Sequence, residues 1–363
     1  MFDVLNKGIL VVPNATRWTG PWLGATRRPS LQRVANRSIV CHVLDAMLEA
    51  GIADVAILLP ADATAEISAC ISAEGPPGLA VSYLELEEDG HRDAALAAAT
   101  KFAGGEACVL HQANGLLGQP LAQFVEALGS DSLDALLLVR DDGQEVRRLK
   151  LVTQRPLSPV DDATPGQLGG AGVFLLGPGS LERLAGMDSD QLGSWCSEYP
   201  LDPALLAQAL ARAGARVHTR VVQKWRSFAG DAHDLLDMNR MMLDKLDPEA
   251  TVAATDGNRF EGPIVIHPTA HVSSSVIVGP AIIGADALIA DSYIGPHTSI
   301  AERVRIEGAE LERTIVLADA SLLHVGGRLV ASVVGREARI FRDFSMPRAL
   351  RLQVGDGDEV ALC

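Results

Sequence analysis

A six-residue repeat of branched aliphatic side chains runs through the last third of the chain. This period is typical of a parallel β-helix, which is built from successive short strands. One side chain of each repeat points into a shared core. A meander of short antiparallel strands is the alternative, but several registers agree on the β-helix. The repeat positions are Ile266, Val272 and Val278, then Ile283 and Ile289, then Ile294, Ile300 and Ile306, and finally Leu311 and Leu317. We therefore predict a β-helix domain over 263–363, preceded by a polar, glycine-rich linker over 247–262.

Residues 1–246 alternate between apolar runs and segments with helical periodicity. The segments GILVVP, VAILLP, LAVSYLEL, ACVLHQAN and DALLLVR have the composition of buried strands. The segment RSIVCHVLDAMLEAGI and residues 64–71 and 92–103 have the pattern of helices. This alternation predicts an α/β domain with a mostly parallel sheet covered on both faces. Ligands of such sheets bind at the carboxyl ends of the strands.

Charge and cysteine content exclude several classes of protein. The 363 residues include 46 acidic and 31 basic side chains, and the net charge of −15 argues against general nucleic-acid binding. Five scattered cysteines without a C-x-x-C pair indicate reduced thiols rather than a metal site. No apolar run approaches the roughly 20 residues of a membrane span, so we expect a cytoplasmic protein.

A basic stretch near the N-terminus stands out against this acidic background. No acidic residue occurs between Asn14 and Asp45. Such a local concentration of positive charge indicates an anion site, although a solvated basic surface is the alternative. Trp18 and Trp22 in the same stretch either pack under a loop or cap a ligand pocket. The arginines of the stretch are Arg17, Arg27, Arg28, Arg33 and Arg37.

Several segments together resemble one enzyme family. VANRSIVCHVLDAMLEAGI looks like the family pattern V-x-N-K-P-I-x-Y-x-L-E-x-L-x-x-A-G-I, and GVFLLGP looks like G-V-Y-x-F. Later parts of the family pattern are also present. They resemble the region from Trp225 to DLLDMNRMML and the repeats VGPAIIGADALI and YIGPHTSIAERV. The chain thus resembles the sugar-1-phosphate nucleotidylyltransferases, above all the long glucose-1-phosphate thymidylyltransferases. The resemblance implies a Rossmann-like nucleotidyltransferase domain with a mixed, mostly parallel sheet, followed by a left-handed parallel β-helix of hexapeptide repeats.

The family reaction joins a sugar 1-phosphate to a nucleoside triphosphate and releases pyrophosphate. The resemblance implies a G-G-x-G-T-R loop, a lysine after it, and two aspartates that hold Mg²⁺. In this chain the loop aligns with residues 13–19, PNATRWT, and the lysine position is Pro29, next to Arg28. The aspartate positions are Ala113 and Ser227, so both metal carboxylates are missing. We therefore expect no metal site and no cofactor, and Mg²⁺ only if the chain is an active enzyme after all.

The resemblance still implies a set of ligand-binding residues. Arg17 and Arg28 are the candidates for a catalytic role, which is otherwise unassigned. The expected ligands are a sugar nucleotide or a sugar phosphate, with no nucleic acid or membrane as partner. The candidate binding residues are Asn14, Thr16, Arg17, Arg28, Gly90, Asn114, Arg155, Gly172, Glu198 and Trp225.

Three functions fit this sequence. The first is a binding protein without nucleotidyl transfer that acts as a regulatory or scaffold subunit. The second is an active nucleotidylyltransferase of deoxysugar or antibiotic biosynthesis with an atypical loop and ligands. The third is an enzyme that uses the nucleotide-binding cleft implied by the resemblance for a different reaction. By resemblance we expect a homo-oligomer, or a hetero-oligomer with an active homologue.

The β-helix histidines suggest a further class, the hexapeptide acyltransferases that use a catalytic histidine. No histidine pairs with an obvious acid along the sequence, so exposed corner positions are the preferred interpretation. These residues are His267, His271, His297 and His324.

Overall fold

The computed structural model describes residues 5–13, 28–86, 92–130, 133–140, 170–188, 201–248 and 257–342. Its N-terminal part contains a seven-stranded sheet in the order β10-β8-β9-β6-β1-β4-β5. All neighbouring pairs are parallel except those of β9, which runs antiparallel to β6 and β8. The mixed, mostly parallel sheet is confirmed. The strands are β1 Lys7–Val11, β4 Asp54–Pro60, β5 Ala80–Leu86, β6 Cys108–Gln112, β8 Ala135–Arg140, β9 Gly170–Leu176 and β10 Val217–Val222.

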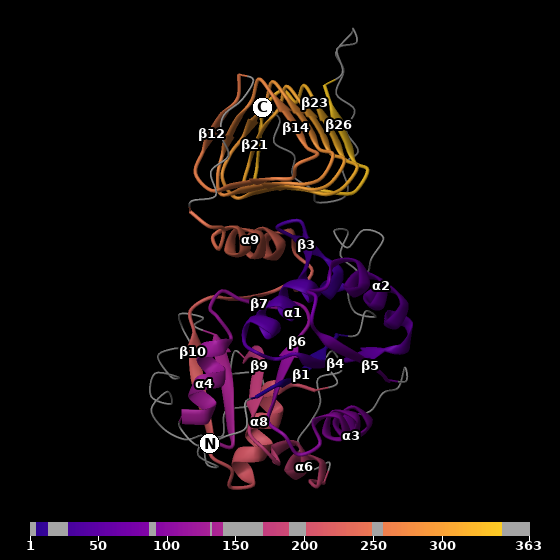
Figure 1. The fold of residues 1–363 in the computed structure, drawn as a ribbon, viewed down its shortest axis with the longest axis vertical. Coiled ribbons are helices and arrows are strands. Elements are labelled where there is room, and N and C mark those ends of the chain that lie inside the picture. The colour runs from indigo at the N-terminus through magenta and orange to yellow at the C-terminus, as the bar shows by residue number, and fades with distance from the viewer. Residues whose placement is uncertain are drawn as a thin grey trace, which may run out of the picture.

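Helices cover both faces of this sheet (Figure 1). On one face lie α1 Ile39–Glu49, α2 Thr64–Glu74 and α4 Ala122–Ser130. On the other lie α3 Arg92–Ala103, α6 Ser180–Ala185 and α8 Pro203–Arg212. Strand β1 serves both cores, because Leu10 packs into the first and Ile9 and Val11 into the second. The helix predicted over 92–103 is confirmed, and the one predicted over 64–71 continues to Glu74.

Short elements complete this domain. Two 3-10 turns, η3 Pro29–Leu31 and η4 Ala61–Ala63, lie near the carboxyl edge of the sheet. A tight hairpin joins β2 Arg33–Val34 to β3 Arg37–Ser38 through Ala35 and Asn36, both at positive φ. Strand β7 Gly115–Leu117 pairs antiparallel with β11 Trp225–Ser227. The β7–β11 ladder links the end of β6 to the segment that leads out of the domain.

The C-terminal part is a parallel β-helix, as predicted. Three five-stranded parallel sheets form its sides, in the orders β12-β15-β18-β21-β24, β13-β16-β19-β22-β25 and β14-β17-β20-β23-β26. The strands are β12 Arg259–Glu261, β13 Ile264–Ile266, β14 His271–Ser273, β15 Val276–Val278, β16 Ala281–Ile283, β17 Leu288–Ala290, β18 Tyr293–Ile294, β19 Thr298–Ile300, β20 Arg305–Glu307, β21 Glu310–Glu312, β22 Ile315–Val316, β23 Ser321–Leu323, β24 Arg328–Val330, β25 Val333–Val334 and β26 Arg339–Phe341.

The buried positions of the β-helix differ in part from the predicted repeat. Ile283, Ile289, Ile294, Ile300, Ile306 and Leu311 are buried in its core as expected. In β15, however, Ile277 is the fully buried residue and Val278 is not, and in β22 Val316 takes the place predicted for Leu317. The difference arises because some repeats contain five residues, as between Ile289 and Ile294. A strict six-residue count then drifts to the neighbouring position.

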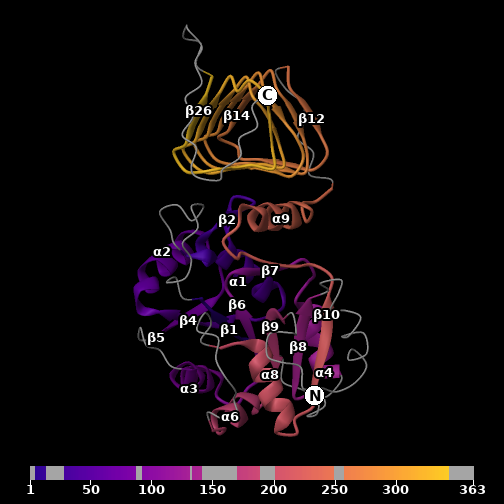
Figure 2. The ribbon, with the colours of Figure 1, turned by 180° about the vertical axis from the view of Figure 1, so that it is seen from behind.

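Helix α9, Ala232–Leu243, lies between the two parts in both views (Figures 1 and 2). Its buried Asn239 accepts a hydrogen bond from the Ala35 amide at 2.7 Å and donates one to the His297 carbonyl at 3.0 Å. The first β-helix strand already begins at Arg259, before residue 263. The division into 1–246, 247–262 and 263–363 stays a prediction. Across the described part of the chain, no helix is both long and apolar enough to cross a membrane.

Candidate functional site

The carboxyl end of β6 and the β7–β11 ladder form the core of the candidate site. Ser227 pairs with Gly115, and the next residue along, Phe228, donates its amide to the Asn114 carbonyl at 2.9 Å. The buried Asn114 side chain returns a hydrogen bond to the Phe228 carbonyl at 3.1 Å. These bonds bring together the two chain segments that carry Ala113 and Ser227. The structure therefore places the two expected carboxylate positions on adjacent segments, and neither holds an acid.

The indole of Trp225 fills the space between β6, β7 and β9. A Cβ atom on Gly115 would lie 2.2 Å from this ring, and one on Gly172 would lie 2.7 Å from it. Gly172 also has a φ of +55°, which side chains rarely adopt. Glycine is thus required at both positions. Asn114, Gly172 and Trp225, predicted separately from the sequence, are brought together at this edge of the sheet.

His111 belongs to the same packed cluster. Its ring lies 5.6 Å from that of Trp225, and its Nδ1 lies 2.8 Å from the Gln112 carbonyl, to which it donates. Burial lowers the pKa of His111 to about 4, and the bond to the Gln112 carbonyl opposes this shift. The imidazole is therefore neutral at pH 7 and acts as part of the core.

Arg28 occupies a different part of the carboxyl edge. It is buried, and its guanidinium forms ion pairs of 2.9 Å with Asp62 and 3.3 Å with Glu66, which follow strand β4. Both carboxylates are largely exposed to solvent. A phosphate would have to compete with them for the guanidinium.

The other described arginines of the basic stretch also face acids. Arg33 pairs with Glu74, and Arg37 pairs with Asp45 at 2.8 Å. These partners come later in the sequence, so the acid-free stretch is not acid-free in space. The remaining predicted residues, Asn14, Thr16, Arg17, Gly90, Arg155 and Glu198, and the tryptophans at 18 and 22, lie outside the described residues.

The described residues at this edge do not fit a magnesium ion. Asp231, an acid near Ser227 in sequence, caps α9 by accepting the His233 amide at 2.9 Å. Asp234 accepts the Ala229 amide at 2.8 Å. Among the described residues, three possible metal ligands come together at Cys41, Cys70 and Glu74. This group lies away from the carboxyl edge. Mg²⁺ prefers carboxylates and water in tight octahedral geometry, which an alanine and a serine do not supply.

Two β-helix histidines have acidic partners, contrary to the expectation from sequence. His297 Nε2 lies 2.9 Å from a carboxylate oxygen of Asp244, and His324 Nε2 lies 3.7 Å from Glu307. Both histidines have positive φ and lie at turns between strands, but His324 is exposed whereas His297 is half-buried. The acids were missed because Asp244 is contributed by the segment after α9 and Glu307 by the preceding coil.

The chain is similar in sequence to proteins named as nucleotidyltransferases. No protein-family model matches the chain. The chain is 28% identical over 351 residues to a glucose-1-phosphate thymidylyltransferase of Streptomyces antibioticus, covering 93% of this chain and 94% of the relative. It is 28% identical to the enzyme of the same name from Streptomyces griseus, covering 91% and 92%. It is 23% identical to the low-salt glycan biosynthesis nucleotidyltransferase Agl11 of Haloferax volcanii, with the same coverage of 91% and 92%.

A solved structure is also similar. A Bacillus anthracis protein, provisionally named a glucose-1-phosphate thymidylyltransferase and solved with a sucrose, superposes with a TM-score of 0.49 at 13% identity. The match covers 65% of this chain and 94% of that one.

Proposed function

We propose, since the chain belongs to the sugar-1-phosphate nucleotidylyltransferase family, that it binds a sugar nucleotide or sugar phosphate but has lost magnesium-dependent nucleotidyl transfer. The supporting observation is the pair of positions at the carboxyl edge of the sheet. Ala113 and Ser227 lie on segments joined by the hydrogen bonds between Asn114 and Phe228. The family resemblance assigns a metal-binding carboxylate to each position, and this chain has neither.

The chemistry explains why this loss matters. Attack on a triphosphate concentrates negative charge on both reacting groups, and Mg²⁺ neutralises much of it. A catalytic metal contributes several kcal/mol of transition-state stabilisation, and one preorganised contact contributes about 3 kcal/mol. Losing the metal and the glycine loop would slow the reaction on the order of 10⁴-fold or more.

Binding does not require the metal. Asn114, Gly172 and Trp225 form a packed, preorganised edge, and strand ends of this kind are where α/β sheets bind their ligands. Arg28 contributes a cation at the same edge when a ligand phosphate displaces Asp62 and Glu66 from its guanidinium. We propose a regulatory or scaffold role in the cytoplasm, as a homo-oligomer or together with an active homologue.

Isothermal titration tests the binding half of this proposal. The full-length protein is titrated with thymidine diphosphate glucose and with glucose 1-phosphate, each in EDTA and in excess Mg²⁺. We expect saturable binding of at least one ligand with an affinity that changes less than about threefold between the two buffers, because no site for the ion is formed. Binding that occurs only with Mg²⁺ would favour the active enzyme, and absence of binding to both ligands would contradict the proposal.

A matched pair of variants tests the cause. Ala113→Asp combined with Ser227→Asp restores both carboxylates, and Ala113→Asn combined with Ser227→Asn provides the same shapes without charge. We expect the aspartate variant alone to acquire Mg²⁺-dependent tightening of nucleotide binding. Equal behaviour of the two variants would show that these positions do not determine metal binding.

A further inference from the structure

Two cysteine thiols meet between helices α1 and α2, away from the carboxyl-edge cluster. Cys41 in α1 is fully buried, whereas Cys70 in α2 is partly exposed. The two sulfur atoms and a carboxylate oxygen of Glu74 all lie within 4.8 Å of one another. Since each thiol is on a helix of the same packed layer, the contact is a stable feature of the fold.

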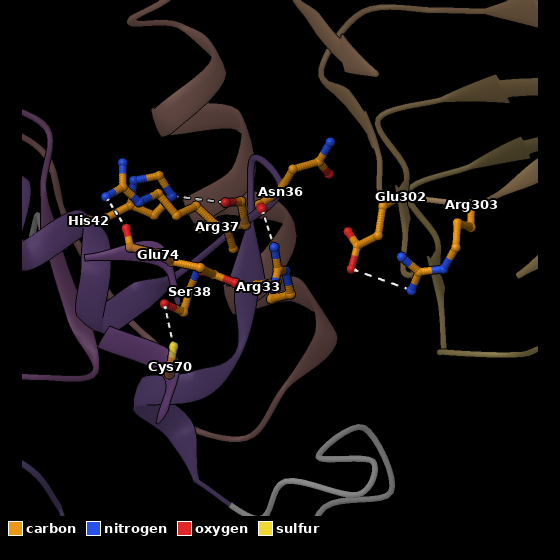
Figure 3. Close-up of polar contacts among 10 residues, drawn as sticks. Arg33, Asn36, Arg37, Ser38, His42, Cys70, Glu74, Glu302 and Arg303 are labelled. Atoms are coloured by element: carbon orange, nitrogen blue, oxygen red, sulfur yellow. Dashed lines mark hydrogen bonds and ion pairs between the residues drawn. The ribbon is translucent and has the colours of Figure 1, made fainter. Parts of the chain in front are cut away.

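Ser38, at the end of the hairpin before α1, points toward Cys70 (Figure 3). Its sulfur lies 3.2 Å from the hydroxyl of Ser38, the N-cap residue of α1, whose side chain makes no capping bond. The Glu74 carboxylate binds the Arg33 guanidinium and accepts the Ser38 amide at 3.2 Å. Arg37 donates to the Glu74 carbonyl. The sulfur thus lies beside a hydroxyl, the ion pair of Arg33 and Glu74, and the positive end of α1.

These surroundings make the two thiols unequal. A hydrogen bond from Cys41, together with the Ser38 hydroxyl and the charge of Arg33, lowers the pKa of Cys70, although burial and the Glu74 carboxylate oppose this. The same bond and burial raise the pKa of Cys41. Cys70 therefore ionises first, and it is also the more accessible of the two. Reactive redox cysteines share these properties and have a second thiol within reach.

We propose that Cys41 and Cys70 are a thiol pair that a hydroperoxide converts reversibly to a disulfide. The Cys70 thiolate attacks one peroxide oxygen, the O–O bond breaks, and the sulfur becomes a sulfenic acid while the other oxygen leaves as water or an alcohol. The Cys41 sulfur then attacks the Cys70 sulfur, an S–S bond forms, the S–O bond breaks, and water leaves. Two thiols are oxidised by two electrons and one peroxide is reduced.

A zinc site is the alternative interpretation of the cluster of Cys41, Cys70 and Glu74. Zinc binds cysteine sulfur and carboxylate oxygen, so the ligand types are acceptable. Both oxygens of Glu74, however, already accept hydrogen bonds, one from Arg33 and one from Ser38. Two guanidiniums beside the cluster also repel a divalent cation. The observations favour the thiol pair.

The disulfide would join two helices next to a contact with the β-helix. The hairpin that ends at Ser38 carries Asn36, whose side chain donates to the Ile300 carbonyl at 2.6 Å. Oxidation would therefore link α1 covalently to α2, next to the hairpin that makes this contact. We expect the oxidised protein to unfold at a higher temperature than the reduced one, because the link restricts the unfolded chain.

Peptide mapping of the full-length protein tests the proposal. The protein is reduced, freed of metal with EDTA, treated with hydrogen peroxide, alkylated and digested without reductant. We expect a linked peptide pair containing Cys41 and Cys70 that disappears after dithiothreitol. In Cys41→Ser, we expect Cys70 to accumulate as a sulfenic acid that dimedone traps. A double variant Cys196→Ser and Cys363→Ser is the control, and it should form the same link at the same rate.

Two results would overturn the proposal. The first is oxidation of Cys70 to a sulfinic acid, or no oxidation at all, while Cys41 in the wild-type protein stays open to alkylation under denaturing conditions. The second is about one zinc ion per chain in the protein before EDTA treatment, absent from both Cys41→Ser and Cys70→Ser, which would make the cluster a metal site. The wild-type map decides the question even if a variant fails to fold.

Discussion

Close contacts around one aromatic ring fix the geometry of the carboxyl edge. Trp225 lies against Gly115 and Gly172 so closely that a methyl group at either position would overlap its ring. Gly172 additionally needs a positive φ. Because interiors are packed to near-crystalline density, such overlaps move the ring or the strand. The geometry of this edge depends on these small residues.

Substitution of Gly172 measures this dependence. Gly172→Ala should lower the free energy of unfolding by about 3 kcal/mol, from backbone strain plus the clash with the side chains of Gln112 and Trp225. Gly214→Ala is the control, because Gly214 has a φ of +79° with nothing within 4 Å of an added Cβ. It should cost only the strain, about 1 kcal/mol. Equal losses in urea titrations would show that the Trp225 contact is unimportant.

Arg28 offers a second test at the level of single residues. If its guanidinium binds a ligand phosphate, Arg28→Ala should weaken sugar-nucleotide binding about tenfold, the loss of one charge-assisted hydrogen bond. Asp62→Asn with Glu66→Gln should tighten binding, because these partners compete for the guanidinium. Titration calorimetry reads both. If both sets of changes leave the affinity unaltered, Arg28 has only a structural role.

A buried histidine should make stability depend on pH. Burial, with the charges of Arg37 and Lys245, lowers the pKa of His42 from 6.5 to about 4, against the bond that its Nε2 makes to the Val34 carbonyl at 2.9 Å. The folded pKa lies below the unfolded one, so this contribution is complete above pH 6.5 and is lost as the pH falls toward 4.

The variant His42→Gln should therefore reduce the slope of stability against pH in this window by about 1.4 kcal/mol per pH unit. Urea titrations at pH 6.5, 5.5 and 4.5 measure the slope. His267→Gln, which removes an exposed imidazole of the β-helix, is the matched control. An unchanged slope in His42→Gln would mean that the pKa of His42 is the same in the folded and the unfolded protein.

At the scale of elements, α9 connects the two parts of the chain. Asn239 bridges the hairpin and the β-helix through two hydrogen bonds, and Arg313 of the β-helix pairs with Asp237 at 3.0 Å. Asn239→Asp keeps the acceptor for the Ala35 amide but turns the donor toward His297 into a second acceptor. We expect a loss of about 2 kcal/mol. Hydrogen exchange should become faster at Ala35 and along β19. Unchanged exchange there would show that this junction does not depend on Asn239.

The elements were largely predictable from local pattern. Helix α3 and the buried strands follow from periodicity and apolar runs, because the local spacing of apolar residues indicates which faces of an element are buried. The β-helix repeat was also predictable from the sequence. The predicted inward positions were wrong by one residue at Val278 and Leu317, because five-residue repeats interrupt the six-residue count. Periodicity fixes the type of an element better than its exact register.

The site was less predictable because its contacts join distant segments. The approach of Asn114 to Phe228 and of Trp225 to Gly172 requires the folded sheet. Likewise, the partners of Arg28 follow strand β4, and nothing near Arg28 in sequence indicates them. The five cysteines are scattered along the sequence, and the contact between Cys41 and Cys70 appears only when α1 and α2 pack together.

At the scale of the whole molecule, the chain has an α/β part and a β-helix part, and it lacks acids at two positions of the carboxyl edge. The similarity to two thymidylyltransferases extends over more than nine-tenths of the chain, with 93% and 91% coverage, so the difference lies in residues rather than in domains. The positions Ala113 and Ser227 lie on adjoining segments, where the family resemblance expects two metal ligands. The proposed loss of metal binding thus rests on these two residues and not on the loss of a domain.

Pyrophosphate release tests this account most directly. The purified protein is incubated with each nucleoside triphosphate and a panel of sugar 1-phosphates, with and without Mg²⁺, beside a relative that is active. We predict release no faster than in protein-free controls for every pair, while nucleotide sugars still bind. Sustained, Mg²⁺-dependent release with any pair, proportional to protein concentration, would contradict the account.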